Sequence, residues 1–220
     1  MTWIVVPAFN EEKNIKKTIL GLLENGYRNI VVIDDGSMDN TAGLAKETGI
    51  KVISHLINRG QGASLQTGHE YVLKAGAEII VDFDADGQFD PMDISSAIEK
   101  LKQENLDVVL GSRFLDDRSQ MPFSKKYFIL PFARFINRFC TGIKLTDVHN
   151  GFRVFTRKAL EKIEITQDKM AHNTQIVSQI KKNKFCFAEV PVKVSYTNYG
   201  QRWYGGLEII KDLIVNFFIK

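Results

Sequence analysis

The sequence has very few of the residues that cross-link small domains or bind structural metals. Cys140 and Cys186 are its only cysteines, and they form no Cys-x-x-Cys pair and lie beside no histidine cluster. This pattern indicates neither a disulfide framework nor a structural zinc site. We therefore expect a protein of a reducing cytoplasm.

Long apolar runs and an excess of one charge are also missing. No segment reaches the ~20 apolar residues that span a bilayer, and residues 1–7 lack the charged leader of a signal peptide. The net charge is only +3, so global electrostatics favour no nucleic-acid partner. We expect no spanning anchor, which leaves room for a segment that lies on a membrane surface.

The size and composition are those of an ordinary globular protein. With 220 residues, of which 44% are hydrophobic and 25% charged, the chain can bury a substantial core. We predict a single domain over residues 1–220, built from a first half, 1–115, and a second half, 116–220.

Short apolar runs alternate with helical patterns through the first half. We predict strands over residues 3–6, 30–33, 51–54, 79–83 and 107–110, with helices beginning near residues 10, 39, 63 and 92. In the second half we predict helices over 156–163 and 173–182, and a last strand within 185–194. This alternation is typical of an α/β fold with a mostly parallel central sheet flanked by helices.

Ligand sites of such sheets lie beyond the carboxyl ends of the strands, and polar clusters occur at those points in this sequence. The first strand is not followed by Gly-x-Gly-x-x-Gly, and the chain has no Walker Gly-Lys-Ser/Thr motif. These absences disfavour dehydrogenases and P-loop enzymes.

The segment after the fourth strand concentrates carboxylates. Asp82, Asp84 and Asp86 alternate along it, and Gln88 continues the pattern. In an extended chain, side chains two residues apart point the same way, so one divalent ion can engage both Asp84 and Asp86. Hard oxygen ligands suit Mg²⁺ or Mn²⁺, which take one or two carboxylates together with substrate phosphates. The alternative for an isolated Asp-x-Asp is a solvated turn.

Five motifs occur in one order along the chain, and together they are more specific than any one of them. They are Pro7-Ala8-Phe9-Asn10-Glu11, Val32-Ile33-Asp34-Asp35-Gly36-Ser37, Asn58-Arg59-Gly60-Gln61-Gly62, Asp84-Ala85-Asp86-Gly87-Gln88 and Gly151-Phe152-Arg153. Over residues 3–195 the chain resembles the family 2 glycosyltransferases. Within that family it is similar to the branch of dolichyl-phosphate mannosyltransferase and bacterial polyprenyl-phosphate glycosyltransferases.

The resemblance implies the GT-A fold and an inverting sugar transfer from a nucleoside-diphosphate sugar, UDP- or GDP-linked. The first half is then the part that binds the nucleotide sugar, and the second half serves the acceptor. Metal binding is implied for Asp84, Asp86 and Gln88, and Asp86 is counted among the catalytic residues. The residues implied in donor binding are Pro7, Ala8, Glu11, Asp35, Gly60, Gly62 and Asp84. The two glycines would let the backbone approach the donor closely, although each also fits a plain turn.

The resemblance also implies a single transfer to a polyprenyl phosphate. The Gln-x-x-Arg-Trp signature of processive synthases is absent, and so is the Glu-Asp pair that often supplies a base. A phosphate acceptor is already an anion at neutral pH and needs no base. Asp147 is the alternative base, for a hydroxyl acceptor, and we count it among the catalytic candidates.

Acceptor binding requires cations. Arg113 matches an acceptor-binding position of the branch and is also a catalytic candidate. A second acceptor arginine falls in a segment that cannot be aligned without a gap, where Lys126, Arg134 and Arg138 are candidates. Arg153 is a further acceptor candidate, with a structural ion pair as its alternative.

Two apolar segments are predicted to be C-terminal interfacial helices. Residues 122–139 interleave phenylalanines with basic side chains, and residues 207–220 are strongly apolar. We expect them to lie on the cytoplasmic face of the membrane, with lysines and arginines reaching anionic headgroups. The alternatives are packing against the core, or docking of a small membrane-spanning partner.

Three other functions compete with a lipid-phosphate glycosyltransferase. A saccharide hydroxyl of a cell-envelope glycan is the other acceptor class. A nucleotidyltransferase would carry a Gly-rich, basic loop after the first strand, and none is found there. An inactive binding subunit is the non-enzyme alternative, which the intact Asp84, Asp86 and Gln88 disfavour.

Overall fold

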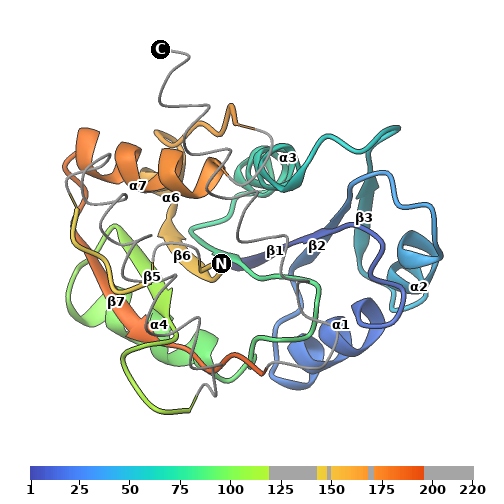
Figure 1. Cartoon of the computed structure of the whole chain (residues 1–220), viewed down its shortest axis with the longest axis horizontal. Helices are drawn as coiled ribbons and strands as arrows, with labels where there is room; N and C mark the ends of the chain where they lie inside the picture. Colours follow the sequence, from blue (N-terminus) through green and yellow to red (C-terminus); the bar gives the residue numbers. More distant parts are fainter. Residues whose placement is uncertain (119–142, 148–149, 168–170, 196–220) are drawn as a thin grey trace, which may run out of the picture.

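The computed structural model describes residues 1–118, 143–147, 150–167 and 171–195, in which a central sheet lies between two helical layers (Figure 1). Seven strands in this described part have the order β3-β2-β1-β4-β6-β5-β7. Their bounds are β1 (Thr2–Ala8), β2 (Ile30–Asp34), β3 (Lys51–Ser54), β4 (Ile79–Asp82), β5 (Val108–Ser112), β6 (Arg153–Thr156) and β7 (Phe187–Pro191).

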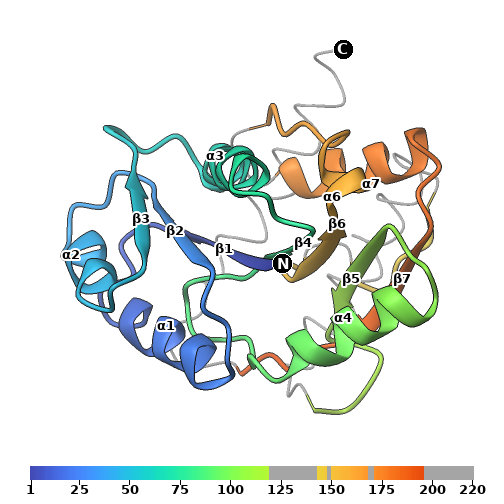
Figure 2. The same cartoon turned by 180° about the vertical axis from the view of Figure 1, so that it is seen from behind.

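The helices divide between the two faces of the sheet, as Figures 1 and 2 both show. One apolar cluster buries α1 (Ile15–Glu24), α2 (Thr41–Lys46) and α4 (Asp93–Gln103) against the sheet. A second cluster, on the opposite face, buries α3 (Gln61–Lys74), α6 (Arg157–Leu160) and α7 (His172–Lys182). Adjacent strand residues alternate between the clusters, with Ile4 and Val6 in the first and Val5 in the second. Both faces of the sheet are therefore covered, which explains the nearly continuous apolar strands.

The strand directions confirm a mostly parallel sheet and add one exception. Strand β1 pairs in parallel with β2 and β4, β2 with β3, and β5 with β7. Strand β6 is antiparallel to both of its neighbours, β4 and β5. It begins at Arg153, at the edge of the sheet where β4 ends. Residues around 150 are thereby brought beside the acidic segment that follows β4.

The first strand is longer than predicted, because Pro7 does not end it. Strand β1 continues to Ala8, with Pro7 opposite Ile33 of β2. On its other side the pairing with β4 covers only Thr2 to Val5. Proline lacks an N–H group, and it is tolerated here because the neighbouring strand on that side has already ended.

Strands from both predicted halves share this sheet, since β6 lies between β4 and β5. The helix predicted over 156–163 was too long, because α6 covers only Arg157–Leu160. The predicted interfacial helices, 122–139 and 207–220, lie outside the described residues. No helix of the described ranges is long and apolar enough to cross a membrane.

Helix α3 packs closely on β1 through a glycine. A Cβ atom on Gly68 would lie 2.3 Å from Cγ1 of Val5, which is fully buried in the sheet. A larger residue at position 68 would push α3 away from β1. Because Gly60 and Gln61 at the start of this helix line the pocket described below, the contact also sets the position of that wall.

We predict that Gly68→Ala destabilises the protein by about 1–3 kcal/mol, because the added methyl overfills the contact with Val5. Equilibrium urea denaturation measures the change. Gly21→Ala, in α1, is the matched control, since its Cβ would meet only Pro91 Cγ at 3.5 Å. That variant is expected to be neutral or stabilised by up to ~1 kcal/mol. Equal effects of the two substitutions would contradict the close-packing account.

Candidate active site

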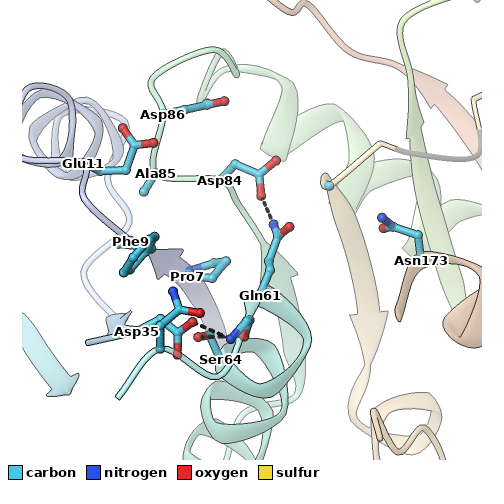
Figure 3. Close-up of a pocket in the computed structure, with 14 residues that line it drawn as sticks. Pro7, Phe9, Glu11, Asp35, Gln61, Ser64, Asp84, Ala85, Asp86 and Asn173 are labelled. Atoms are coloured by element: carbon cyan, nitrogen blue, oxygen red, sulfur yellow. Dashed lines mark hydrogen bonds between the residues drawn. The ribbon is translucent and has the colours of Figure 1, made fainter. Parts of the chain in front are cut away.

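One pocket of about 360 Å³ opens at the carboxyl ends of β1, β2 and β4 and beside the first turn of α3 (Figure 3). Seven of the predicted site residues line it: Pro7, Ala8, Glu11, Asp35, Gly60, Asp84 and Asp86. The lining also contains seven residues for which the sequence predicted no site role. Five of them lie in the quoted motifs and two, Ser64 and Asn173, do not; the five are Phe9, Asn58, Gln61, Ala85 and Gly151. Of the predicted residues in the described part of the chain, Gly62, Gln88, Arg113, Asp147 and Arg153 lie outside this lining.

Asp84 lies just beyond β4, on the side of the pocket that faces α3. Gln61 donates a hydrogen bond from Nε2 to Asp84 Oδ1 at 2.9 Å (Figure 3). Burial, together with the charge of Asp86, raises the pKa of Asp84 to about 7, although the charge of Arg153 opposes the increase. Asp84 therefore needs a nearby cation to be fully ionised at neutral pH.

Asp86 lies in a turn that α1 holds in place. Thr18 donates from its hydroxyl to the Ala85 carbonyl at 3.0 Å, and Gly87 adopts a positive φ of 72°. The Gln88 backbone N–H donates to Asp86 Oδ1 at 3.0 Å. Burial raises the pKa of Asp86, and this hydrogen bond opposes the change. Gln88 thus orients Asp86 through its backbone, and the metal contact of its side chain stays a prediction.

Glu11 stands on the same side of the pocket as Asp86 (Figure 3). Its backbone N–H donates to Thr41 Oγ1 at 2.7 Å, and Asn14 donates to its Oε2 at 2.8 Å. Burial raises the pKa of Glu11, the Asn14 hydrogen bond lowers it, and the charge of Asp86 raises it again. The pocket therefore concentrates negative charge on two walls.

The carboxylates fit a divalent ion that is shared with a phosphate ligand. Strand β4 ends at Asp82, so the extended geometry predicted for Asp84 and Asp86 does not continue to them. Asp84 turns toward Gln61 and Asp86 lies nearer Glu11 (Figure 3). No group of three or more Asp, Glu, His or Cys among the described residues would by itself hold a metal. Two carboxylates with water and phosphate oxygens are the usual ligand set of Mg²⁺.

Asp35 organises the wall below the start of α3. It accepts hydrogen bonds from the backbone N–H groups of Arg59 and Gly60, at 3.0 and 2.6 Å, and its Oδ1 lies 2.7 Å from His55 Nδ1. Gly60 needs to be glycine because its φ is 97°. Gly62 lies outside the pocket lining, and a Cβ there would lie 2.0 Å from the Gln167 carbonyl oxygen, so close packing on residue 167 is one reason for a glycine at this position. Its contact with the donor stays a prediction.

Arg113 and Asp147 form a two-pronged ion pair beyond the end of β5. Arg113 Nε and Nη2 each donate to a different oxygen of Asp147, both at 2.6 Å. Asp147 is only 4% exposed. Burial would raise the pKa of Asp147, but the hydrogen bonds and charge of Arg113, with a bond from Asn150, hold it below its usual value. Asp147 is thus a weak base that orients Arg113.

Arg153 lies under the pocket and not in it. The side chain is buried, with Nη1 at 3.7 Å from Asp82 Oδ2 and with Nη2 donating to Asn173 Oδ1. Asp82 Oδ1 lies 2.7 Å from His69 Nε2. This geometry favours the structural ion pair over the predicted contact with an acceptor. Lys126, Arg134 and Arg138, the other acceptor candidates, lie outside the described residues.

Comparisons with known proteins place the chain in a family. The model of the family described as "Glycosyl transferase family 2" matches residues 3–164. The chain is 33% identical to the UDP-N-acetylglucosamine–dolichyl-phosphate N-acetylglucosaminyltransferase of Methanococcus voltae, over 90% of this chain and 87% of that protein. It is 28% identical to the polyprenol monophosphomannose synthase of Mycolicibacterium smegmatis, over 90% of this chain and 79% of that protein.

A solved structure supports the same fold. Glucosyl-3-phosphoglycerate synthase of Mycobacterium tuberculosis, in complex with Mn²⁺, UDP and glucosyl-3-phosphoglycerate, is similar with a TM-score of 0.74 and 18% identity, over 99% of this chain and 78% of that one. This likeness concerns the fold, which is the GT-A fold predicted above. The family model covers most of the chain, and the chain therefore belongs to glycosyltransferase family 2.

Proposed function

We propose that this enzyme transfers a single hexose or N-acetylhexosamine from a UDP- or GDP-linked donor to a polyprenyl phosphate, with inversion at the sugar carbon. The observation that carries the proposal is the pocket in which Asp84 and Asp86 face the loops of Pro7, Asp35 and Gly60. The names of the two relatives, which specify dolichyl phosphate and polyprenol monophosphomannose, support the class of acceptor.

The donor would occupy the pocket with its nucleoside toward Asp35 and its diphosphate toward the carboxylates. Asp84 and Asp86 would hold Mg²⁺ or Mn²⁺, with Glu11 adding negative charge beside Asp86. The ion would act as a Lewis acid that neutralises charge on the departing nucleoside diphosphate. Because both carboxylates are partly shielded from water, their attraction to the ion would be stronger than at a fully exposed site.

The state of Asp147 supports a phosphate acceptor over a hydroxyl acceptor. A general base works best with a pKa near the operating pH, whereas the pKa of Asp147 is held below its usual value by Arg113. A phosphate oxygen carries its negative charge already. It can form the new bond to the sugar carbon, as the bond from that carbon to the donor diphosphate breaks, without losing a proton.

Arg113 would hold the acceptor phosphate. Its guanidinium is oriented by two hydrogen bonds to Asp147, and it is partly exposed beyond the end of β5. An arginine held in this way recognises phosphate with little further loss of conformational freedom. Asp147 is then a positioning residue and Arg113 the group that contacts substrate.

A polyprenyl acceptor places the reaction at a membrane, and we propose that the enzyme works there as a peripheral protein on the cytoplasmic face. The aromatic and basic segment 122–139 and the apolar segment 207–220 are the parts of the sequence suited to contact lipid. A small membrane-spanning partner docked on the same segments is the alternative anchor.

A donor and acceptor panel tests the proposed function. UDP- and GDP-sugars are incubated with Mn²⁺ and a polyprenyl phosphate in anionic vesicles, and nucleotide release and organic-extractable sugar are measured. We expect release that depends on the lipid and a product that mild acid cleaves. Transfer to a saccharide with no lipid product would instead identify a hydroxyl acceptor, and no turnover with any donor would favour an inactive binding subunit.

The same anionic vesicles can be used to test whether the protein binds directly to a membrane surface. The full chain is expected to float with anionic vesicles at low salt, and a variant with Lys125, Lys126, Arg134 and Arg138 all changed to Glu is expected not to float. Wild-type protein that stays in the soluble fraction would exclude direct binding and favour the membrane-spanning partner.

We predict that Asp84→Asn and Asp86→Asn each abolish metal-dependent transfer, with a loss of at least about a hundredfold, because each removes one charged ligand. Chelation of the metal should have the same effect on wild type. Asp107→Asn is the matched control, since Asp107 pairs with Lys158 at the opposite end of β5. Near-normal turnover of either pocket variant would show that the carboxylates do not serve the metal.

We predict that Arg113→Ala raises the KM for the lipid acceptor roughly ten- to a hundredfold and changes the donor KM little. A charge-assisted hydrogen bond to phosphate contributes about 1.5–3 kcal/mol. Initial rates with each substrate varied in turn measure the two constants. Arg118→Ala is the matched control, because Arg118 is bound to Asp93 and Asp116. An equal rise in both KM values would move Arg113 to the donor side.

A further inference from the structure

The backbone of Gly151 occupies an unusual position against Asp84. A Cβ atom on residue 151 would lie 2.2 Å from Asp84 Oδ2 and 2.7 Å from both Asp84 Cγ and Oδ1. Real Cβ atoms essentially never approach other atoms this closely, so the carboxylate fills the space that a side chain at position 151 would need. Any larger residue there would have to displace Asp84 or the segment that carries Gly151.

The backbone conformation does not explain this glycine. The described glycines with a positive φ are Gly26, Gly36, Gly49, Gly60, Gly76 and Gly87, and Gly151 is not one of them. The penalty that a positive φ imposes on residues with a side chain therefore does not apply at position 151. What requires glycine at position 151 is the space taken by the Asp84 carboxylate.

The segment around Gly151 is firmly held, so it can act as a fixed surface. Phe152 is fully buried, its N–H donates to Asn150 Oδ1 at 2.9 Å, and its carbonyl accepts from the Gly111 N–H at 2.9 Å. Arg153 follows, buried beneath the pocket beside Asp82. Gln61, at the start of α3, donates a hydrogen bond to Oδ1 of the same Asp84 carboxylate (Figure 3). The carboxylate is therefore held between α3 and the chain that enters β6.

We propose that Gly151 is a positioning residue for Asp84. Because glycine has no side chain, the Asp84 carboxylate packs directly against the backbone of residue 151, and this contact sets the orientation in which Asp84 would bind the metal. The inference rests on the proposed function, in which Asp84 is a metal ligand. Gly151 lies 67 positions after Asp84 in the sequence, and only the antiparallel insertion of β6 beside β4 brings the two together.

A double-mutant cycle tests the contact itself. Melting temperatures are measured for wild type, Gly151→Ala, Asp84→Ala and the double variant. In the wild-type background Gly151→Ala is expected to lower the Tm by about 4–8 °C, as overpacking does in a domain of this size. In the Asp84→Ala background the same change should shift the Tm by less than about 2 °C, because the clashing carboxylate is gone.

Metal affinity tests the functional part. Binding of Mn²⁺, with UDP or GDP present, is followed by the paramagnetic resonance signal of the free ion. Folded Gly151→Ala is expected to bind Mn²⁺ at least tenfold more weakly than wild type, while the Gly21→Ala control binds it equally well. If Gly151→Ala does not fold, the double variant should still fold, because removing the Asp84 carboxylate reopens the space.

Three results would overturn the proposal: an equal loss of Tm in both backgrounds, failure of the double variant to fold, or unchanged Mn²⁺ affinity in folded Gly151→Ala when Asp84→Ala binds Mn²⁺ more weakly. These outcomes are separate from failure of the proposed function, which would appear as unchanged Mn²⁺ affinity in Asp84→Ala. The double-mutant cycle of melting temperatures can then still establish the packing contact between Gly151 and Asp84, because it requires no metal.

Discussion

The structure depends on the concentration of negative charge beyond β4. Asp82, Asp84 and Asp86 follow one another there, and Glu11 joins them from the loop after β1. Burial of such groups is costly unless a cation offsets it. Arg153 offsets part of the charge from below, beside Asp82, and the pocket above it is left with carboxylates whose pKa values are raised. That residual negative charge is the feature on which the proposed binding of a metal and a diphosphate depends.

The topology of the sheet brings the loops of the pocket and the start of β6 next to these carboxylates. The parallel strands β1, β2 and β4 end at one edge, so their loops form three walls of a single pocket. Strand β6 enters between β4 and β5 from the opposite direction. It brings Arg153 below the carboxylates and Gly151 beside Asp84. A wholly parallel sheet would have placed the start of this strand at the far edge.

Much of the donor side could be predicted from the sequence, because its signals are local. Apolar runs that stop at Asp34 or Asp82 mark strand ends, and parallel pairing brings such ends together without further information. The conformations of Gly60 and Gly87 likewise follow from neighbouring residues. The family 2 resemblance added an expected role for each motif, and the family itself is confirmed by the comparison over residues 3–164.

The remaining features depend on contacts between residues far apart in the chain, which no local pattern encodes. The sequence does not distinguish an arginine that lines the pocket from one that is buried beneath it. The structure shows that Arg153 is buried beneath the pocket. It also does not show that Gly62 packs on the Gln167 carbonyl, or that the amide of Gln61 reaches Asp84. The pairing of Arg113 with Asp147 spans 34 positions and was likewise invisible.

The ion pair between Arg113 and Asp147 affects which parts of the sequence can change during evolution. The ion pair ties together the two ends of the stretch between positions 113 and 147, and Asn150 and Glu189 secure its second end to the sheet side through Asp147 and Thr146. Because these anchoring contacts involve none of residues 119–142, exchanges within that range can alter the acceptor preference of the proposed enzyme without removing the ion pair or the carboxylates that follow β4.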